Sequence, residues 1–122
     1  MKLTSIMIGS AEPKVLADYY RALFGEPRWD EGGYVGWQFG GGGIAIGAHD
    51  QVTGKNPTPG RLMWNLETND VKGDFARLKA AGGTVVQEPY EPAGAGTGMW
   101  VATFADPDDN YFQLMSPMEP QG

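Results

Sequence analysis

Residues 103–114 read Thr-Phe-Ala-Asp-Pro-Asp-Asp-Asn-Tyr-Phe-Gln-Leu, and this stretch decides the fold. Apolar side chains alternate on both sides of a short polar segment, which predicts two strands joined by a turn. Pro107 presets the backbone at the start of the turn. The Asp and Asn residues that follow it tolerate the left-handed conformations that close such a turn. The segment therefore predicts a β-hairpin at 103–114.

The composition is that of one globular unit with a core. The chain has 122 residues, 41% hydrophobic and 20% charged, and no Cys, which excludes disulfides and thiolate sites. A net charge of −6 argues against nucleic acid and against an anionic membrane surface. The acidity is compatible with a cationic ligand, but solubility alone is the simpler explanation. No apolar run is long enough for a signal peptide or a membrane span, so a cytoplasmic location is expected.

Gly and Pro residues punctuate the chain between short apolar runs, and the runs follow the same order twice. The first set comprises a strand at 2–9, a helix at 13–24, and strands at 28–31, 34–39 and 43–49. After a Pro- and Gly-rich linker at 50–60, the second set comprises a strand at 61–67, a helix at 71–81, and strands at 84–89, 98–105 and 111–116.

The two predicted helices also resemble each other. At an offset of 56 residues, Tyr19 aligns with Phe75 and Arg21 aligns with Arg77. Because the strand order on both sides matches as well, the chain contains a βαβββ unit twice. Each unit is expected to bury one sheet face under its helix, and the other sheet faces are expected to curve together into a cleft.

Two motifs give this repeat a family likeness. The hairpin at 103–114 resembles the F-x-D-P-D-G-N-x-x-E-L segment of the vicinal oxygen chelate superfamily, which includes glyoxalases, bleomycin-resistance proteins and extradiol dioxygenases. Residues 18–25 resemble that family's F-Y-x-x-x-L-G segment. The resemblance implies a single α+β domain over 1–122, with one βαβββ module at about 2–49, a second at about 61–117, and curved mixed sheets forming a cleft. It also implies a homodimer, because many small members pair modules across chains.

The chain departs from the family pattern where a metal would bind. In metal-dependent relatives each module offers one ligand on its first strand and one on its last. The resemblance places these positions at Ser5, Ala45, Met63 and Gln113. Shifting a placement by one residue adds no good ligand, and Gln113 alone offers one neutral oxygen. No metal and no cofactor are therefore expected.

Other groups with catalytic chemistry are few, and no catalytic residue is assigned. His49, the only His, ends a strand before a loop, where it reads as a loop anchor or as a general base. Asp70 is expected to cap the second helix, with Asp74 in its first turn. Gly40–Gly43 precedes a strand and is not followed by Lys-Ser/Thr, so it predicts a hairpin turn and not a phosphate loop.

The candidate ligand site is the strand face that carries the family positions. Because side chains alternate, Met7, Asn65 and Met115 share the face of Ser5, Met63 and Gln113. Three Trp residues are added because such rings wall ligand clefts by stacking, although Trp and Met also fill cores. The predicted ligand-binding residues are Ser5, Met7, Trp37, Met63, Trp64, Asn65, Trp100, Gln113 and Met115. The Gly-rich loop at 90–98 is either a lid or a connection.

These features favour a metal-free protein that binds a small molecule, similar to the bleomycin-resistance branch of the superfamily. An aromatic or antibiotic-like ligand, neutral or cationic, is expected. The alternative is an enzyme of the lyase, isomerase or dioxygenase type with an atypical or cofactor-free site. A purely structural dimerising module is the third hypothesis.

Overall fold

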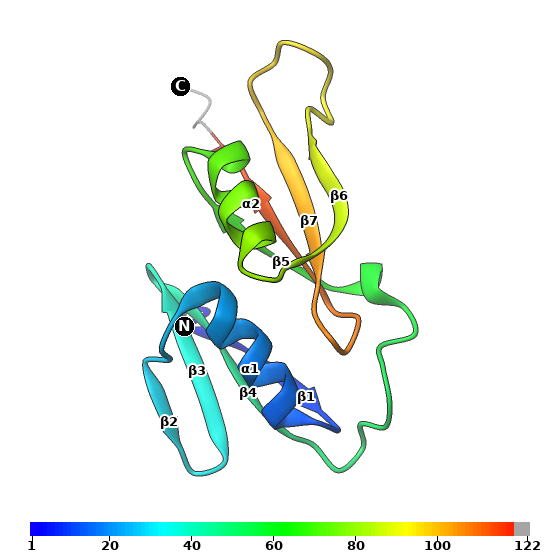
Figure 1. Cartoon of the computed structure of the whole chain (residues 1–122). Helices are drawn as coiled ribbons and strands as arrows, with labels where there is room; N and C mark the ends of the chain where they lie inside the picture. The colour runs from blue at the N-terminus through cyan, green and yellow to red at the C-terminus, as the bar shows by residue number, and fades with distance from the viewer. Residues whose placement is uncertain (119–122) are drawn as a thin grey trace.

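The computed structural model describes residues 1–118 and shows two βαβββ modules side by side (Figure 1). Module 1 contains β1 (Ser5–Ser10), α1 (Pro13–Phe24), β2 (Trp29–Glu31), β3 (Tyr34–Phe39) and β4 (Gly42–Ala48). A linker with one 3-10 turn, η1 (Pro59–Arg61), leads to module 2. Module 2 contains β5 (Met63–Glu67), α2 (Val71–Ala80), β6 (Thr84–Tyr90), β7 (Val101–Ala105) and β8 (Tyr111–Met115).

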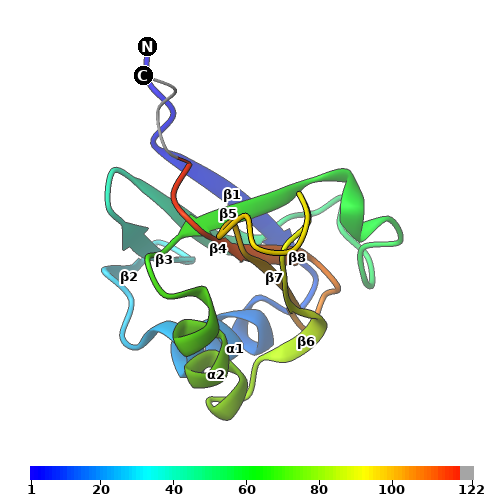
Figure 2. The same cartoon turned by 90° about the horizontal axis from the view of Figure 1, so that it is seen from above.

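The two sheets have the same topology, which confirms the predicted repeat. The strand orders are β1-β4-β3-β2 and β5-β8-β7-β6, and in each module the first and last strands pair in parallel. The two sheets do not close on each other within one chain. Both helices cover the same side of the molecule, so the helix-free faces of the two sheets point the same way and do not face each other (Figure 2).

A single hydrophobic core lies between the sheets and the helices and joins the modules. Phe112 of module 2 stacks on Trp64, with ring centroids 4.8 Å apart, and also on Phe104, at 5.4 Å. Tyr20 of α1 reaches across the module boundary to Trp64 at 5.9 Å and to Phe112 at 6.0 Å. Because aromatic contacts cross the boundary, each module helps to hold the other in place.

Element boundaries follow local chemistry. Helix α1 spans the predicted residues because Pro13 occupies its first turn and Gly25 ends it with a φ of 83°. The strand predicted at 98–105 begins only at Val101, since Gly98 has a φ of 78° that a strand does not accommodate. The strand predicted at 2–9 begins at Ser5, so the first four residues lie outside the sheet.

The turn of the closing hairpin is fastened to α1 through buried Asp106. Its carboxylate accepts hydrogen bonds from the Tyr20 hydroxyl at 2.7 Å and from the backbone N–H groups of Asp108 and Asn110 at 2.9 Å each. Burial raises the pKa of Asp106, and burial together with the nearby Asp106 charge raises the pKa of Tyr20. The hairpin motif of module 2 is therefore also linked to helix α1 of module 1 by the hydrogen bond between Tyr20 and Asp106.

Candidate functional site

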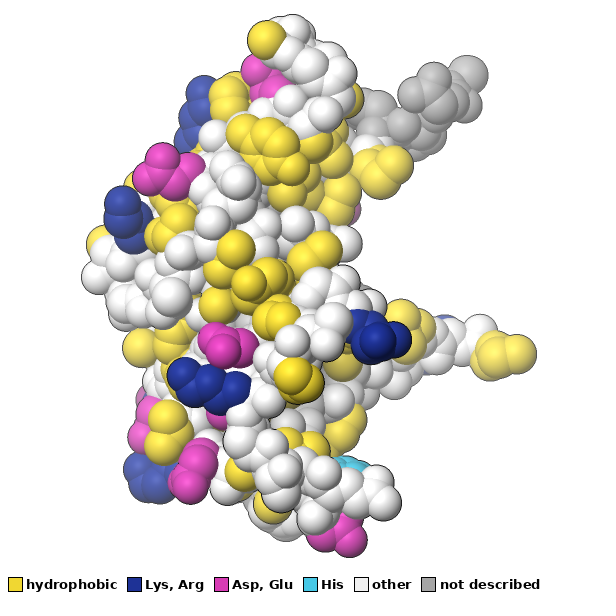
Figure 3. Space-filling view, turned by 90° about the vertical axis from the view of Figure 1, so that its right-hand side faces the viewer, with side chains coloured by type: hydrophobic (Ala, Val, Ile, Leu, Met, Phe, Trp, Pro, Cys, Tyr) yellow, Lys and Arg dark blue, Asp and Glu magenta, His cyan; other side chains and the backbone are white. Residues whose placement is uncertain are grey.

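Strand alternation places six of the nine predicted ligand residues on the helix-free face of the sheets, hereafter the outer face. Their alternating neighbours on β1, β5 and β8, such as Ile8, Trp64 and Phe112, are buried on the helix side. Asn65 pairs with Gln113 across β5 and β8. In the space-filling view the outer face is seen edge-on, and its outline is indented beside a projecting segment of the chain (Figure 3). The six residues are Ser5, Met7, Met63, Asn65, Gln113 and Met115.

The structure does not bring the three predicted Trp residues to the outer face, so they lie apart from the other six. Trp37 is 3% exposed, and its indole N–H donates to the Gly25 carbonyl at 2.9 Å. Trp64 is 6% exposed and alternates with Met63 and Asn65, so it must point to the helix side. Trp100 lies under the ammonium of Lys72 on α2, which is 3.8 Å from the ring centroid.

Two other aromatic rings occupy the outer face of module 1. A Cβ added to Gly36 would lie 2.0 Å from the Trp29 ring, and one added to Gly47 would lie 2.6 Å from the Tyr34 ring. Both glycines therefore let an aromatic ring lie directly on the sheet. The sequence signal was the pair of Gly residues at outward-facing positions of two strands. The sequence alone did not show that Trp29 and Tyr34 lie over these glycines, because that depends on how the strands pair.

The outer face of module 2 has a small polar centre among apolar side chains, with Glu67 at the end of β5 opposite Met115. The Gln113 side chain donates its N–H to the Thr103 hydroxyl at 3.0 Å, and no donor among residues 1–118 reaches its carbonyl oxygen. The exposed Asn65 side chain lies beside it, and Met63 and Met115 flank the pair. This arrangement can accept and donate hydrogen bonds to a mostly apolar ligand.

The four metal-binding positions of metal-dependent relatives do not fit a metal in this chain. Ala45 has no donor atom, Met63 offers only a thioether, and Ser5 and Gln113 offer neutral oxygens. A divalent ion requires several N, O or S donors of which some are anionic or imidazole. Among the described residues, no group of three or more His, Cys, Asp and Glu side chains comes together.

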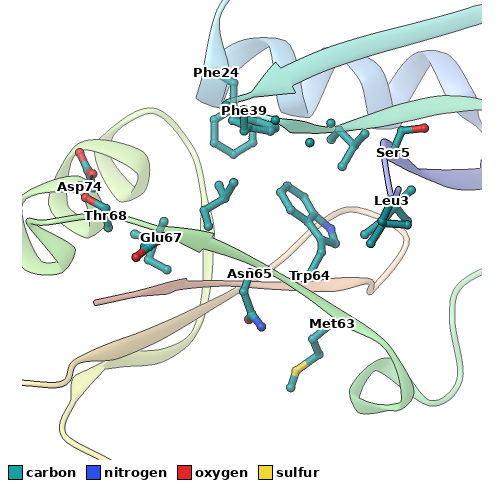
Figure 4. Close-up of a pocket in the computed structure, with 18 of the residues that line it drawn as sticks. Leu3, Ser5, Phe24, Phe39, Met63, Trp64, Asn65, Glu67, Thr68 and Asp74 are labelled. Atoms are coloured by element: carbon teal, nitrogen blue, oxygen red, sulfur yellow. Dashed lines mark hydrogen bonds between the residues drawn. The ribbon is translucent and has the colours of Figure 1, made fainter. Parts of the chain in front are cut away.

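A groove of about 850 Å³ lies between the modules (Figure 4). The start of β1 and the β3–β4 hairpin form one wall, and β5 and α2 form the other. Its apolar lining includes Phe24, Phe39 and Trp64, and Figure 4 shows Trp64 extending from β5 toward the opposite wall. The groove meets the outer face at the edge strand β5, where Met63 and Asn65 line both.

The polar rim of the groove is acidic. Asp74 accepts hydrogen bonds from the Thr68 hydroxyl at 2.6 Å and from Arg77 at 3.1 Å, and these bonds, that of Thr68 above all, lower its pKa. Glu67 forms no hydrogen bond or ion pair with another side chain of residues 1–118. The Trp64 indole N–H is buried and has no hydrogen-bond partner among residues 1–118.

The remaining candidates have structural explanations. The His49 ring nitrogen Nδ1 accepts a hydrogen bond from the Gln51 backbone N–H at 3.1 Å, so this half-exposed side chain anchors the turn after β4. The loop at 90–98 is organised by Glu91, whose carboxylate accepts from the N–H groups of Gly96 at 3.1 Å and Gly98 at 2.7 Å. These bonds lower the pKa of Glu91. The loop therefore has a defined conformation of its own.

The chain belongs to the glyoxalase-like domain family, whose family model matches residues 5–115. This places it in the vicinal oxygen chelate superfamily. No curated protein matches the chain. No helix among the described residues is both long and apolar enough to cross a membrane.

Several solved structures share the fold at low sequence identity. A glyoxalase-related enzyme from Fulvimarina pelagi is 21% identical with a TM-score of 0.72, over 100% of this chain and 95% of that one. TnmS3, an antibiotic-binding protein from Streptomyces sp. CB03234, is 23% identical with a TM-score of 0.71, over 97% of both chains. A glyoxalase/bleomycin resistance protein/dioxygenase family enzyme from Burkholderia phytofirmans PsJN is 18% identical with a TM-score of 0.71, over 97% of this chain and 100% of that one.

Proposed function

We propose that the protein binds an aromatic small molecule, without a metal, on the outer face of its sheets. The observation that carries this proposal is the make-up of that face. Exposed Met63 and partly exposed Met115 flank the amide groups of Asn65 and Gln113, and the four metal positions of the family lack suitable donors. An antibiotic-binding protein with the same fold, TnmS3, supports the class of function but not the ligand.

The charge and shape of the face favour a planar ligand that is neutral or cationic. None of the eight strands contains a Lys or an Arg, so the face offers no counter-charge to a phosphate or a carboxylate. Trp29 and Tyr34 on module 1 supply rings for stacking, which adds on the order of 1 kcal/mol per contact beyond the burial of apolar area. Met side chains adapt to irregular apolar shapes.

We also propose that a second copy of the chain completes the cleft. The outer face leaves Met7 and Tyr34 each 46% exposed and Met63 39% exposed, and β1 and β5 are edge strands. Pairing module 1 of one chain with module 2 of its partner would cover these side chains and enclose a ligand between two outer faces.

The test is a panel of aromatic antibiotics, aromatic dyes and organic phosphates, read by Trp emission and by protection against heat. Aromatic neutral or cationic compounds are expected to bind in the micromolar range. Gln113→Ala is expected to weaken binding by about tenfold, since it removes a polar contact in an apolar setting. Gln51→Ala, an exposed linker residue, is the matched control and should leave binding unchanged.

Elemental analysis after purification without chelator tests the metal-free part of the proposal. Zn, Ni, Mn and Fe are all expected well below one equivalent per chain. One equivalent that disappears in Gln113→Ala would refute it. Binding confined to the organic phosphates would refute the ligand class and favour an enzyme acting on phosphorylated substrates.

A further inference from the structure

We propose that the groove between the modules is a separate binding site for a compact planar aromatic cation. The inference does not rest on the outer-face proposal. The residues that carry it are Phe24, Phe39, Trp64, Gly41 and Gly42, with Glu67 at the edge where the groove meets the outer face. A volume of about 850 Å³ is in the range of small-molecule sites, and the lining combines aromatic rings with a few polar groups.

The hairpin that forms one wall of the groove contains more glycine than its own backbone requires. In Gly40–Gly43, Gly40 has a φ of 58°, and a Cβ on Gly43 would lie 2.6 Å from the Trp37 carbonyl oxygen. Gly41 and Gly42 have ordinary φ values, and a Cβ on either would meet nothing within 4 Å. A turn in which only the first central residue needs positive φ does not demand glycine at these two positions.

No other part of the described chain packs against Gly41 or Gly42, and both residues line the groove. Glycine at such a position lets another molecule approach the backbone closely. The open space faces a cluster of three rings. Phe24 and Phe39 meet edge to face at 5.0 Å, and Trp64 lies 6.0 Å from Phe39 and 6.3 Å from Phe24. Phe24 and Phe39 are only partly buried, so they present ring surface to an occupant.

The charge of the rim selects a cation. Asp74 is already paired with Arg77, whereas Glu67 lines the groove without a cationic partner among residues 1–118. An aromatic cation would stack on the ring cluster and bring its charge toward Glu67, and the faces of the rings also attract positive charge. A single carboxylate at a partly exposed rim contributes a preference and not the main affinity.

The test uses three tricyclic dyes of the same size: proflavine, a cation; acridone, which is neutral; and acridine-9-carboxylate, an anion. Proflavine is expected to bind most tightly and the anion most weakly. Gly41→Leu is expected to weaken proflavine binding at least tenfold by filling the groove. The matched control is Gly60→Leu, because Gly60 also has open space around its Cβ position but lies in η1, away from the groove.

A second experiment tests the role of the Glu67 charge and leaves the glycines of the hairpin unchanged. Glu67→Gln should weaken proflavine about fivefold and leave acridone unchanged, whereas the exposed Glu88→Gln should change neither. This experiment decides the question even if Gly41→Leu fails to fold, which circular dichroism would reveal. Gly41→Leu separates the two sites, because Gly41 lines the groove and is not part of the residue set proposed for the outer face.

Three results would overturn the inference. The first is equal weakening by Gly41→Leu and Gly60→Leu. The second is a Glu67→Gln variant that behaves like Glu88→Gln. The third is a Gly41→Leu variant that converts a dimer into a monomer in sedimentation while dye binding persists, since that would identify a second copy of the chain as the occupant.

Discussion

At the residue scale, Asp106 shows how one side chain of a local motif acts over a long range. Its neighbours Asp108 and Asn110 supply backbone donors, which is the local part of the turn. The Tyr20 hydroxyl, 86 residues away along the chain, supplies a further donor from α1. A buried carboxylate needs such partners, because an unsatisfied polar group in a protein interior is costly.

Removing the Tyr20 hydroxyl should therefore destabilise the whole chain. Tyr20→Phe is expected to lower the free energy of unfolding by about 1–3 kcal/mol, since it leaves buried Asp106 without one donor while keeping the ring. Chemical denaturation measures the change. Tyr34→Phe, at a half-exposed ring, is the control and should change stability by less than about 0.5 kcal/mol. Equal effects would contradict the role given to Asp106.

The raised pKa of Asp106 predicts a pH dependence. The folded state binds this proton more tightly than the unfolded state, because burial disfavours the charged carboxylate. The resulting stability is fully present below about pH 4 and is lost as pH rises through the folded pKa. The difference in unfolding free energy between the wild type and Asp106→Asn should therefore be larger at pH 4 than at pH 7. A difference that grows toward neutral pH would contradict the direction of this shift.

Asp109 is the one non-Gly residue at positive φ among residues 1–118, with a φ of 61°. The family hairpin has Gly at this position, and a Cβ in the left-handed region costs roughly 1 kcal/mol, less for Asp than for most residues. Asp109→Gly is expected to raise the free energy of unfolding by up to about 1 kcal/mol. Asp50→Gly, at an exposed turn position with ordinary φ, should have the opposite sign because it only adds chain entropy to the unfolded state.

At the scale of elements, the two helices of the repeat begin in different ways. Helix α2 has a side-chain cap, in which the Asp70 carboxylate accepts from the Gly73 backbone N–H at 3.0 Å. Helix α1 follows Glu12, which makes no side-chain cap, and relies on Pro13 in its first turn. The same architecture is thus reached through different local chemistry.

The Asp70 cap is expected to cancel the stabilisation that replacing a helical glycine with alanine usually brings. Gly73→Ala would normally stabilise a helix by about 1 kcal/mol, but here the new Cβ would lie 2.1 Å from an Asp70 carboxylate oxygen. The substitution is therefore expected to bring no gain in the wild type and about 1 kcal/mol in the Asp70→Ala background. Thermal and chemical unfolding of the four variants of this cycle measures the coupling. Simple additivity would contradict the cap.

At the scale of the whole molecule, the outer face exposes apolar side chains that no other part of one chain covers. A homodimer is expected at micromolar concentration, and sedimentation or light scattering measures it. Met7→Glu and Met63→Glu should each favour the monomer, since they place a charge among side chains that a partner would bury. Val15→Glu, at an exposed position of α1 on the opposite side, is the control. A wild type that is monomeric at these concentrations would contradict the prediction.

The sequence by itself determined the repeat, the element types and the direction in which strand residues point. These follow from short-range rules: helical spacing, strand alternation and turn residues act within a few positions of each other. Starting from the positions that the family resemblance implied, strand alternation placed Met7 on the face of Ser5, Asn65 on that of Met63, and Met115 on that of Gln113. The absence of good metal ligands was also readable from residue type alone.

Only the tertiary structure decided which side of each sheet faces the core, how the modules sit together and which rings are exposed. Trp64 alternates with Met63 on the same strand, so the two cannot line the same face, but which of them is buried depends on where α1 and Phe112 pack. Trp29 and Tyr34 reach the outer face because two glycines from other parts of the sheet leave room for them. Burial is a property of contacts between distant segments, and a local pattern does not contain it.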